Sequence, residues 1–262
     1  MLGFFRKRQS EAIAARSVPE GQRVYAVGDI HGCRDLLEDL LAEIAADDRA
    51  RGDAQTQIVF LGDLVDRGPD SAGVIDRLID LAAVHDNVRF ILGNHEEIFL
   101  RALDGDIDSL RLFGRIGGRE TILSYGVSAQ DYERTDYPEL LALMQARVPQ
   151  RHIDFLKSFE DRIEIGDYLF VHAGLRPGTA IENQRQSDMR WIRSTFLESD
   201  WEFGKIVVHG HSISDEVVVR PNRIGIDTGA YDTGRLTAIG LQGFDRWFLT
   251  TGAAPQAAAV FG

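Results

Sequence analysis

The fold is decided by the stretch Gly28-Asp29-Ile30-His31-Gly32, which follows the apolar segment 23–27 and precedes residues 34–46. Segment 23–27 is typical of a short buried strand, and residues 34–46 place leucines at the spacing of an amphipathic helix. The two glycines allow the backbone to turn sharply between these elements. We therefore expect Asp29 and His31 to lie on a tight turn at the carboxyl end of a strand.

The same arrangement recurs twice further along the chain. Segment 57–61 is apolar and ends at Gly62-Asp63, and segment 88–92 ends at Gly93-Asn94-His95, with a predicted helix at residues 71–84 between them. Strands separated by helices of this length predict parallel βαβ units. Open sheets of this kind hold their ligands beyond the carboxyl ends of the strands. The three polar turns are therefore expected to meet at one ligand site.

The rest of the chain extends this pattern into a second sheet. Residues 104–150 are helical by pattern, but their helices are too short for a core of their own, so we interpret them as a helical insertion near the site. The second half is strand-rich, with β character at 162–165, 168–171, 205–208, 217–220, 223–226, 236–241 and 245–249. We predict an α/β (α+β) fold of two packed mixed β-sheets flanked by helices. The expected organisation is a flexible leader at 1–20, a single domain at 21–250 and a tail at 251–262.

Composition and charge narrow the possible functions. The chain has 262 residues, 44% of them hydrophobic, and a formal net charge of −12. This acidic balance argues against broad nucleic-acid binding, which depends on Lys and Arg. No apolar run approaches the ~20 residues needed to span a bilayer. The basic patch at residues 4–8 could touch an anionic membrane surface, but one short patch gives only weak, reversible attachment, so we expect no stable membrane association. A single cysteine, Cys33, forms no internal disulfide, which is typical of the cytoplasm. The oligomeric state cannot be predicted.

Polar residues at the ends of strands form a set of potential metal ligands. Carboxylate, amide and imidazole groups suit hard and borderline divalent metals. Any one such residue is more often a turn, a helix cap or a surface side chain. Five strand ends that each carry a competent ligand favour a metal centre, and its members are Asp29, His31, Asp63, Asn94, His172 and His211.

Three motifs in the first half of the chain are Gly28-Asp29-Ile30-His31-Gly32, Gly62-Asp63-Leu64-Val65-Asp66-Arg67-Gly68 and Gly93-Asn94-His95-Glu96. Together they resemble the signature of the calcineurin-like metallophosphoesterases. The Asp-Arg-Gly ending of the second motif resembles the phosphoprotein phosphatase branch, especially the bacterial and phage enzymes, which are close to the symmetrical diadenosine tetraphosphatases. The resemblance spans residues 23–241 and implies a β-sandwich with α/β/β/α layers. Its segments are Gly28–Gly32, Gly62–Gly68, Gly93–Glu96, His172–Gly174, Gly210-His211 and Ile226–Ala230.

This resemblance implies a role for each ligand. Asp29 and His31 would hold the first metal, and Asp63 would bridge both metals. The second metal would be held by Asn94, His172 and His211. Such pairs share a bridging hydroxide, which would attack the phosphate directly. The expected cofactors are two divalent ions, with Mn²⁺ first and Fe or Zn²⁺ as alternatives.

The resemblance also implies residues that handle the phosphate. Arg67 and Asn94 would bind substrate phosphate oxygens, and His95 would protonate the leaving group as general acid. Asp66 would keep His95 charged and oriented. Arg193, in Trp191-Ile192-Arg193, resembles a second phosphate-binding arginine. We expect His209 to support the site rather than ligate, and Cys33 to be a small packed residue.

One departure separates the branches of the family. Nucleases and cyclic-nucleotide diesterases resemble Gly-His-x-His at the last motif, whereas Ile213 stands at the final position here. Because both Asp66 and Arg67 are present, we expect a phosphatase acting on phosphoserine and phosphothreonine. The alternative is a symmetrical diadenosine tetraphosphate hydrolase. A non-catalytic phosphate-binding module would lack a ligand or His95, and neither is missing. The expected partner is a phosphoprotein or a phosphorylated small molecule.

Overall fold

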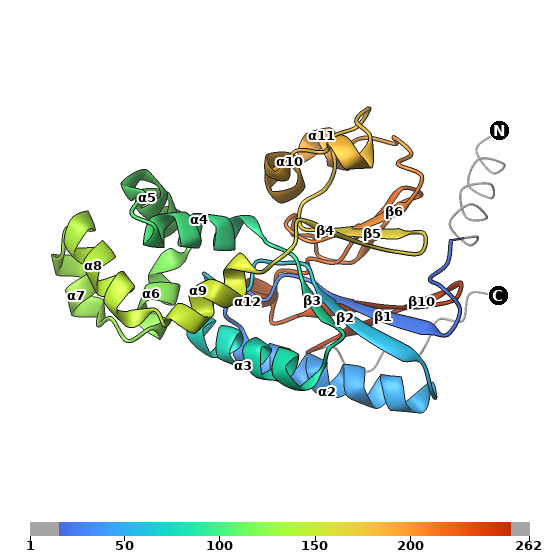
Figure 1. Cartoon of the computed structure of the whole chain (residues 1–262), viewed down its shortest axis with the longest axis horizontal. Coiled ribbons are helices and arrows are strands. Elements are labelled where there is room, and N and C mark those ends of the chain that lie inside the picture. Colours follow the sequence, from blue (N-terminus) through green and yellow to red (C-terminus); the bar gives the residue numbers. More distant parts are fainter. Residues whose placement is uncertain (1–15, 253–262) are drawn as a thin grey trace.

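The computed structural model describes residues 16–252. Two five-stranded sheets pack against each other, and helices cover their outer faces (Figure 1). The layer order is therefore helix, sheet, sheet, helix, as the sequence predicts. The expected leader residues 1–15 and tail residues 253–262 lie outside the described part of the chain. Val18 is buried, and its amide donates to Gly243 O at 3.1 Å, so this segment packs against the domain.

The first sheet has the strand order β10-β9-β1-β2-β3. Strands β1, β2 and β3 are parallel, as the strand–helix alternation predicts, whereas β9 and β10 run antiparallel. The predicted third strand is shorter than expected, because Ile91 leaves the ladder to bridge Glu160. The bounds are β1 (Gln22–Val27), β2 (Gln55–Phe60), β3 (Val88–Phe90), β9 (Thr237–Gln242) and β10 (Asp245–Thr250).

The second sheet has the order β4-β5-β6-β8-β7. Its central strands β5, β6 and β8 are parallel, so their carboxyl ends also point to one edge. The edge strands β4 and β7 are antiparallel to their neighbours. The bounds are β4 (Arg162–Ile165), β5 (Tyr168–Val171), β6 (Ile206–His209), β7 (Val218–Val219) and β8 (Arg223–Gly225).

Side-chain alternation along the strands divides the core into three layers. In β1, Val24 and Ala26 face the second sheet, whereas Tyr25 and Val27 face the helices. In β5 the alternation continues, with Phe170 between the sheets and its neighbours against the other helical layer. A strand buried on both faces reads as a continuous apolar run, which explains the composition of these segments.

Helices cover each outer face. The first sheet is covered by α2 (Arg34–Ala50) and α3 (Ser71–Val84), and the second by α10 (Gln186–Trp191) and α11 (Ser194–Leu197) (Figure 1). A 3-10 turn lies at Ile181–Asn183 and a short helix, α12 (Ala230–Thr233), precedes β9. Among residues 16–252, no helix has both the length and the apolar character needed to cross a bilayer.

The predicted insertion is helical and extends away from the sheets (Figure 1). It follows α4, and its helices pack on α4 and on α3 rather than on a separate core. Gly117, with a φ of 116°, separates α5 from α6. The bounds are α4 (Asn94–Leu103), α5 (Ile107–Ile116), α6 (Gly118–Ser124), α7 (Ala129–Arg134), α8 (Tyr137–Arg147) and α9 (Gln150–Lys157).

Candidate metal centre

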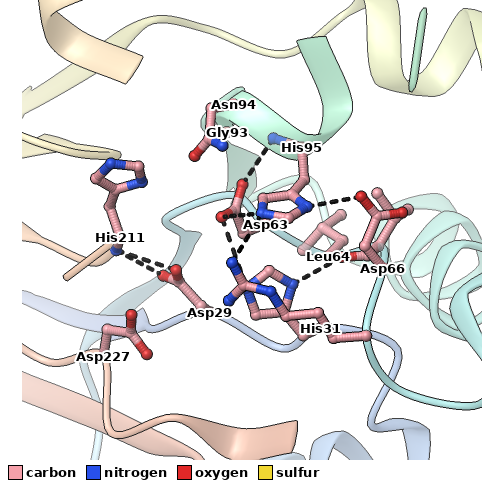
Figure 2. Close-up of polar contacts among 12 residues, drawn as sticks. Asp29, His31, Asp63, Leu64, Asp66, Gly93, Asn94, His95, His211 and Asp227 are labelled. Atoms are coloured by element: carbon pink, nitrogen blue, oxygen red, sulfur yellow. Dashed lines mark hydrogen bonds and ion pairs between the residues drawn. The ribbon is translucent and has the colours of Figure 1, made fainter. Parts of the chain in front are cut away.

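The polar turns of both sheets meet at one edge of the sandwich (Figure 2). Within residues 16–252, the non-glycine residues with left-handed backbone all belong to these turns, and they are His31, Asp63, Asp66, Arg67 and His211. Such conformations are costly for residues with a Cβ atom and are concentrated at functional sites. The backbone is therefore shaped to direct these side chains rather than to minimise local strain.

Two glycines let backbone approach the carboxylates closely. A Cβ atom at Gly93 would lie 2.2 Å from Asp63 Oδ1, and one at Gly210 would lie 2.0 Å from Asp29 Oδ1. Any larger residue at either position would collide with a predicted ligand. The glycines of the motifs are thus required by packing inside the site as well as by turn geometry.

Three predicted ligands, Asn94, His172 and His211, converge on one side of Asp63. His172 Nε2 lies 2.9 Å from Asn94 Oδ1, 3.2 Å from His211 Nδ1 and 3.4 Å from Asp63 Oδ1. His172 Nδ1 is 2.8 Å from the carbonyl of Leu61 and donates to it, so Nε2 is the nitrogen that faces the cluster. Asp63, His172 and His211 form a buried group able to hold a metal ion.

A second buried group lies on the other side of Asp63. His31 Nε2 and His95 Nε2 lie 3.7 and 3.8 Å from Asp63 Oδ2, and the three residues form a further potential metal site. Arg67 donates from Nη1 to His31 Nε2 at 2.9 Å and from Nη2 to His95 Nε2 at 3.1 Å. Asp29 is not a member of this group, and both its oxygens accept the amide of His211 at 3.0 and 3.2 Å.

The pKa shifts of His31, His211 and Asp29 are those expected around a cation site. Burial lowers the pKa of His31 to about 3 and that of His211 to about 2, so both rings are neutral at pH 7, which is the ligating form. Burial and the charges of Asp227 and Asp63 raise the pKa of Asp29 well above its usual value. A cation would relieve this repulsion. In the part of the chain that the structure describes, His211 Nε2 also has no hydrogen-bond partner.

His95 is held by a chain of hydrogen bonds on the side away from the metal ligands. Its Nδ1 lies 2.6 Å from Asp66 Oδ2, and Asp66 Oδ1 accepts Thr121 Oγ1 at 2.7 Å. Burial lowers the pKa of His95, but Asp63 and the bond to Asp66 raise it more, so it lies above the ordinary value. Nε2 of His95 is therefore the nitrogen presented to the site, as a general acid requires.

The helical insertion fixes the turn that carries Asp66 and Arg67. The amide of Arg67 donates to Gly117 O at 3.0 Å, and the amide of Asp66 donates to Thr121 Oγ1 at 2.8 Å. A Cβ at Gly117 would lie 2.7 Å from Arg67 Cγ. The insertion thus reaches the site through these residues, although they are distant in sequence.

Glu96 joins the second and third motifs. Its carboxylate accepts the amides of Asp63 at 2.8 Å, Leu64 at 2.7 Å and Gly93 at 3.0 Å. These bonds hold the turn after β2 against the start of α4. Burial raises the pKa of Glu96 to about 7, with the Asp63 charge adding to the effect.

Arg193, His209 and Cys33 lie around the predicted ligands rather than among them. Arg193 Nη1 lies 3.4 Å from the carbonyl of His211, at the margin of the site. His209 is buried and its ring packs edge-on against Phe196. Half-buried Cys33 lies beside the first motif, with Sγ 3.4 Å from the carbonyl of His31.

Four residues of the site have no role in the sequence prediction: Glu96, Thr121, Asp227 and Tyr231. Glu96 and Asp227 belong to the motifs on which the resemblance rests, so their positions could have been singled out. Tyr231 is 40% exposed, lies edge-on to His31 at 5.4 Å and packs under the Arg67 guanidinium. Thr121 carries no local signal, because only the folded chain brings it to Asp66.

Curated proteins with related sequences include dinucleotide hydrolases. The symmetrical bis(5'-nucleosyl)-tetraphosphatase of Acidovorax sp. strain JS42 is 34% identical over 59% of this chain, but the chain spans only 44% of that protein. The symmetrical enzyme of Janthinobacterium sp. strain Marseille is 29% identical over 83% of this chain and 92% of its own length. The asymmetrical enzyme of Anoxybacillus flavithermus is 25% identical over 81% and 88%.

Solved structures share the fold. A structure provisionally assigned as a diadenosine tetraphosphatase has a TM-score of 0.62 at 24% identity and covers 90% of this chain and 98% of its own. A cold-active protein tyrosine phosphatase has a TM-score of 0.55 at 19% identity, with coverages of 92% and 82%. A family profile described as calcineurin-like phosphoesterase matches residues 22–235.

Proposed function

The chain belongs to the calcineurin-like phosphoesterase family, and from this premise we propose that it is a metal-dependent hydrolase of dinucleoside tetraphosphates. The observation that carries the proposal is the buried cluster of carboxylate and imidazole donors around Asp63, in which Asp63, His172 and His211 form one group able to hold a metal ion. Such an arrangement suits two divalent ions and the hydrolysis of a phosphoric anhydride or ester. The named relatives support the dinucleotide substrate over a phosphoprotein, which reverses the order of the two candidates expected from sequence.

The residues present fit two metals. Asp63 would bridge the ions, with His31 and Asp29 on one side and the group of Asn94, His172 and His211 on the other. When bound, the ions offset the charge of the phosphate oxygens and lower the pKa of a water molecule. Mn²⁺ is our first candidate, because carboxylate, amide and imidazole ligands suit it, with Fe and Zn²⁺ as alternatives.

In this proposal Arg67 binds the phosphate and His95 protonates the leaving group. A guanidinium binds two phosphate oxygens in a planar fork, and Asn94 and Arg193 lie close enough to the ligands to assist. Because His95 Nε2 accepts from Arg67, that nitrogen cannot carry a proton until Arg67 turns toward the phosphate. The charge of Asp66 then stabilises the imidazolium that protonates the leaving oxygen.

A second candidate is hydrolysis of phosphoserine and phosphothreonine monoesters. The 2.6 Å contact of His95 with Asp66 favours it, because an alkoxide leaving group needs a general acid more than a phosphate leaving group does. A non-catalytic phosphate-binding module is disfavoured, since His95 and every expected ligand are present. A phosphorylated small molecule is the proposed partner, and neither nucleic acid nor membrane is invoked.

Side-by-side kinetics would separate these candidates. Purified protein loaded with Mn²⁺ is offered diadenosine tetraphosphate and a phosphoserine peptide, and kcat/KM is measured for each. We expect a large preference for the dinucleotide, with ADP as the only nucleotide product of symmetrical cleavage. ATP with AMP would indicate asymmetrical cleavage, and a preference for the peptide would refute the proposal.

A further inference from the structure

Asp227 enters the site from the second sheet. It lies two residues beyond β8, and the amide of Ile226 donates to His209 O at 3.0 Å, which ties the segment to β6. A Cβ atom at Gly28 would lie only 2.6 Å from Ile226 O, so this backbone runs directly beside the first motif. The side chain of Asp227 consequently lies next to that of Asp29 (Figure 2).

One carboxylate oxygen of Asp227 has a hydrogen-bond partner, and the other has none among the described residues. Oδ1 accepts the amide of Gly229 at 3.0 Å, which fixes the side chain. Oδ2 is buried and has no hydrogen-bond partner among residues 16–252, in a residue only 2% exposed. A buried carboxylate oxygen with no donor is unfavourable unless a cation faces it.

The surroundings of this oxygen are strongly acidic. Asp29 and Asp63 are also each 2% exposed, so three carboxylates share the same buried region. Arg67 of the site donates to His31 and His95. Ile213, which packs over Gly229, contributes no donor. Three buried carboxylates therefore lie together here, and Oδ2 of Asp227 has no hydrogen-bond donor among the described residues.

We propose that Asp227 is a further carboxylate ligand of the metal centre, on the side of Asp29, and that its free oxygen contacts the ion held there. The donors on that side would then come from both sheets, with Asp29 after β1 and Asp227 after β8. Hard divalent cations such as Mn²⁺ favour such oxygen donors. The inference rests on the metal centre of the proposed function and not on its substrate.

Metal binding tests this without any substrate. Calorimetric titration of Mn²⁺ into metal-free protein should give two ions per chain for the wild type. In Asp227→Asn, we expect the affinity for one ion to fall more than about 100-fold, beyond the 10–100-fold typical of residues that only orient a ligand. Asp232→Asn is the matched control, because it removes the same charge from an exposed position in α12, five residues further along the chain, and should change neither affinity.

A crystal structure of the Mn²⁺-loaded wild type decides the role independently of any variant. An Asp227 oxygen within about 2.5 Å of an ion supports the proposal. A water or a shared proton between Asp227 and Asp29, with no ion in contact, overturns it, as do unchanged Mn²⁺ affinities in Asp227→Asn. Failure to hydrolyse dinucleotides would refute the substrate alone, because both measurements are made without it.

Discussion

Replacing Asp66 by Asn tests how His95 is held as an acid. The contact between His95 Nδ1 and Asp66 Oδ2 is 2.6 Å, and the two side chains are 2% and 0% exposed. A hydrogen bond to a charged group contributes about 1.5–3 kcal/mol, which corresponds to roughly 10- to 150-fold in rate at about 1.4 kcal/mol per tenfold. Asn has the same shape and still accepts the proton of Nδ1, so the fold should survive.

The loss should depend on the leaving group and on pH. We expect kcat/KM for an alkyl phosphate to fall about 10- to 150-fold, whereas an aryl phosphate with an acidic leaving group should lose less than about threefold. Asp66 helps to raise the pKa of His95, so the acid form persists to higher pH in the wild type. Without that charge the pKa falls, and activity should decline at a lower pH as pH rises.

The assay is kcat/KM for both substrates with Mn²⁺-loaded protein over a pH series. Asp76→Asn serves as control, because Asp76 makes a similar 2.7 Å contact with His152 outside the site and should not affect turnover. Equal losses on the alkyl and aryl substrates, or an unmoved basic limb, would refute the role of Asp66 in supporting an acid.

Three further perturbations follow from the geometry. Thr121→Val removes the hydroxyl that contacts both the amide and the carboxylate of Asp66, so the free energy of unfolding measured in urea should fall by about 1–3 kcal/mol. A fall below about 0.5 kcal/mol, which is typical of a surface substitution, would contradict this. Gly93→Ala should weaken Mn²⁺ binding measured by calorimetry, because the new Cβ would lie 2.2 Å from Asp63 Oδ1; unchanged affinity would be evidence against the close approach. Adding Mn²⁺ at about 100 times its Kd should stabilise the protein by about 2.7 kcal/mol for each site, and calorimetric melting that is insensitive to Mn²⁺ and to chelator would count against a metal centre.

The fold could be predicted because its signals are local. The strands at 162–165 and 168–171 were predicted with the bounds that the structure gives them, since buried strands are short apolar runs between turn residues. The alternation of predicted strands and helices along the chain likewise indicates sheets covered by helices. The end of α2 was missed by four residues, because Asp47 and Asp48 continue the helix without apolar spacing. Their side chains bind Tyr25 and Arg23 on the neighbouring strand, which periodicity does not report.

The site was predictable where ligands lie at strand ends, but not where distant segments support them. Asn94, His172 and His211 meet as expected, because parallel strands bring their carboxyl ends together. Thr121 reaches Asp66 across 55 positions of sequence, and its neighbours in α6 give no sign of this. Asp29 accepts the amide of His211, a contact between the two sheets that the order of the motifs along the chain does not predict.

The Asp66–Arg67 turn is attached to the helical insertion, so this part of the site should unfold locally at a lower free energy than the part that carries the metal ligands. The metal ligands come from strand ends in the core, whereas Arg67 and Asp66 are tied to Gly117 and Thr121 of the α5–α6 segment. Proteins open in cooperative units, and peripheral helices open at lower free energy than central strands. Amide hydrogen exchange should therefore find the Arg67 amide exchanging together with α6, and earlier than the amides of β1. Fluctuations of the insertion would release the phosphate-handling residues while the ligands stay in place.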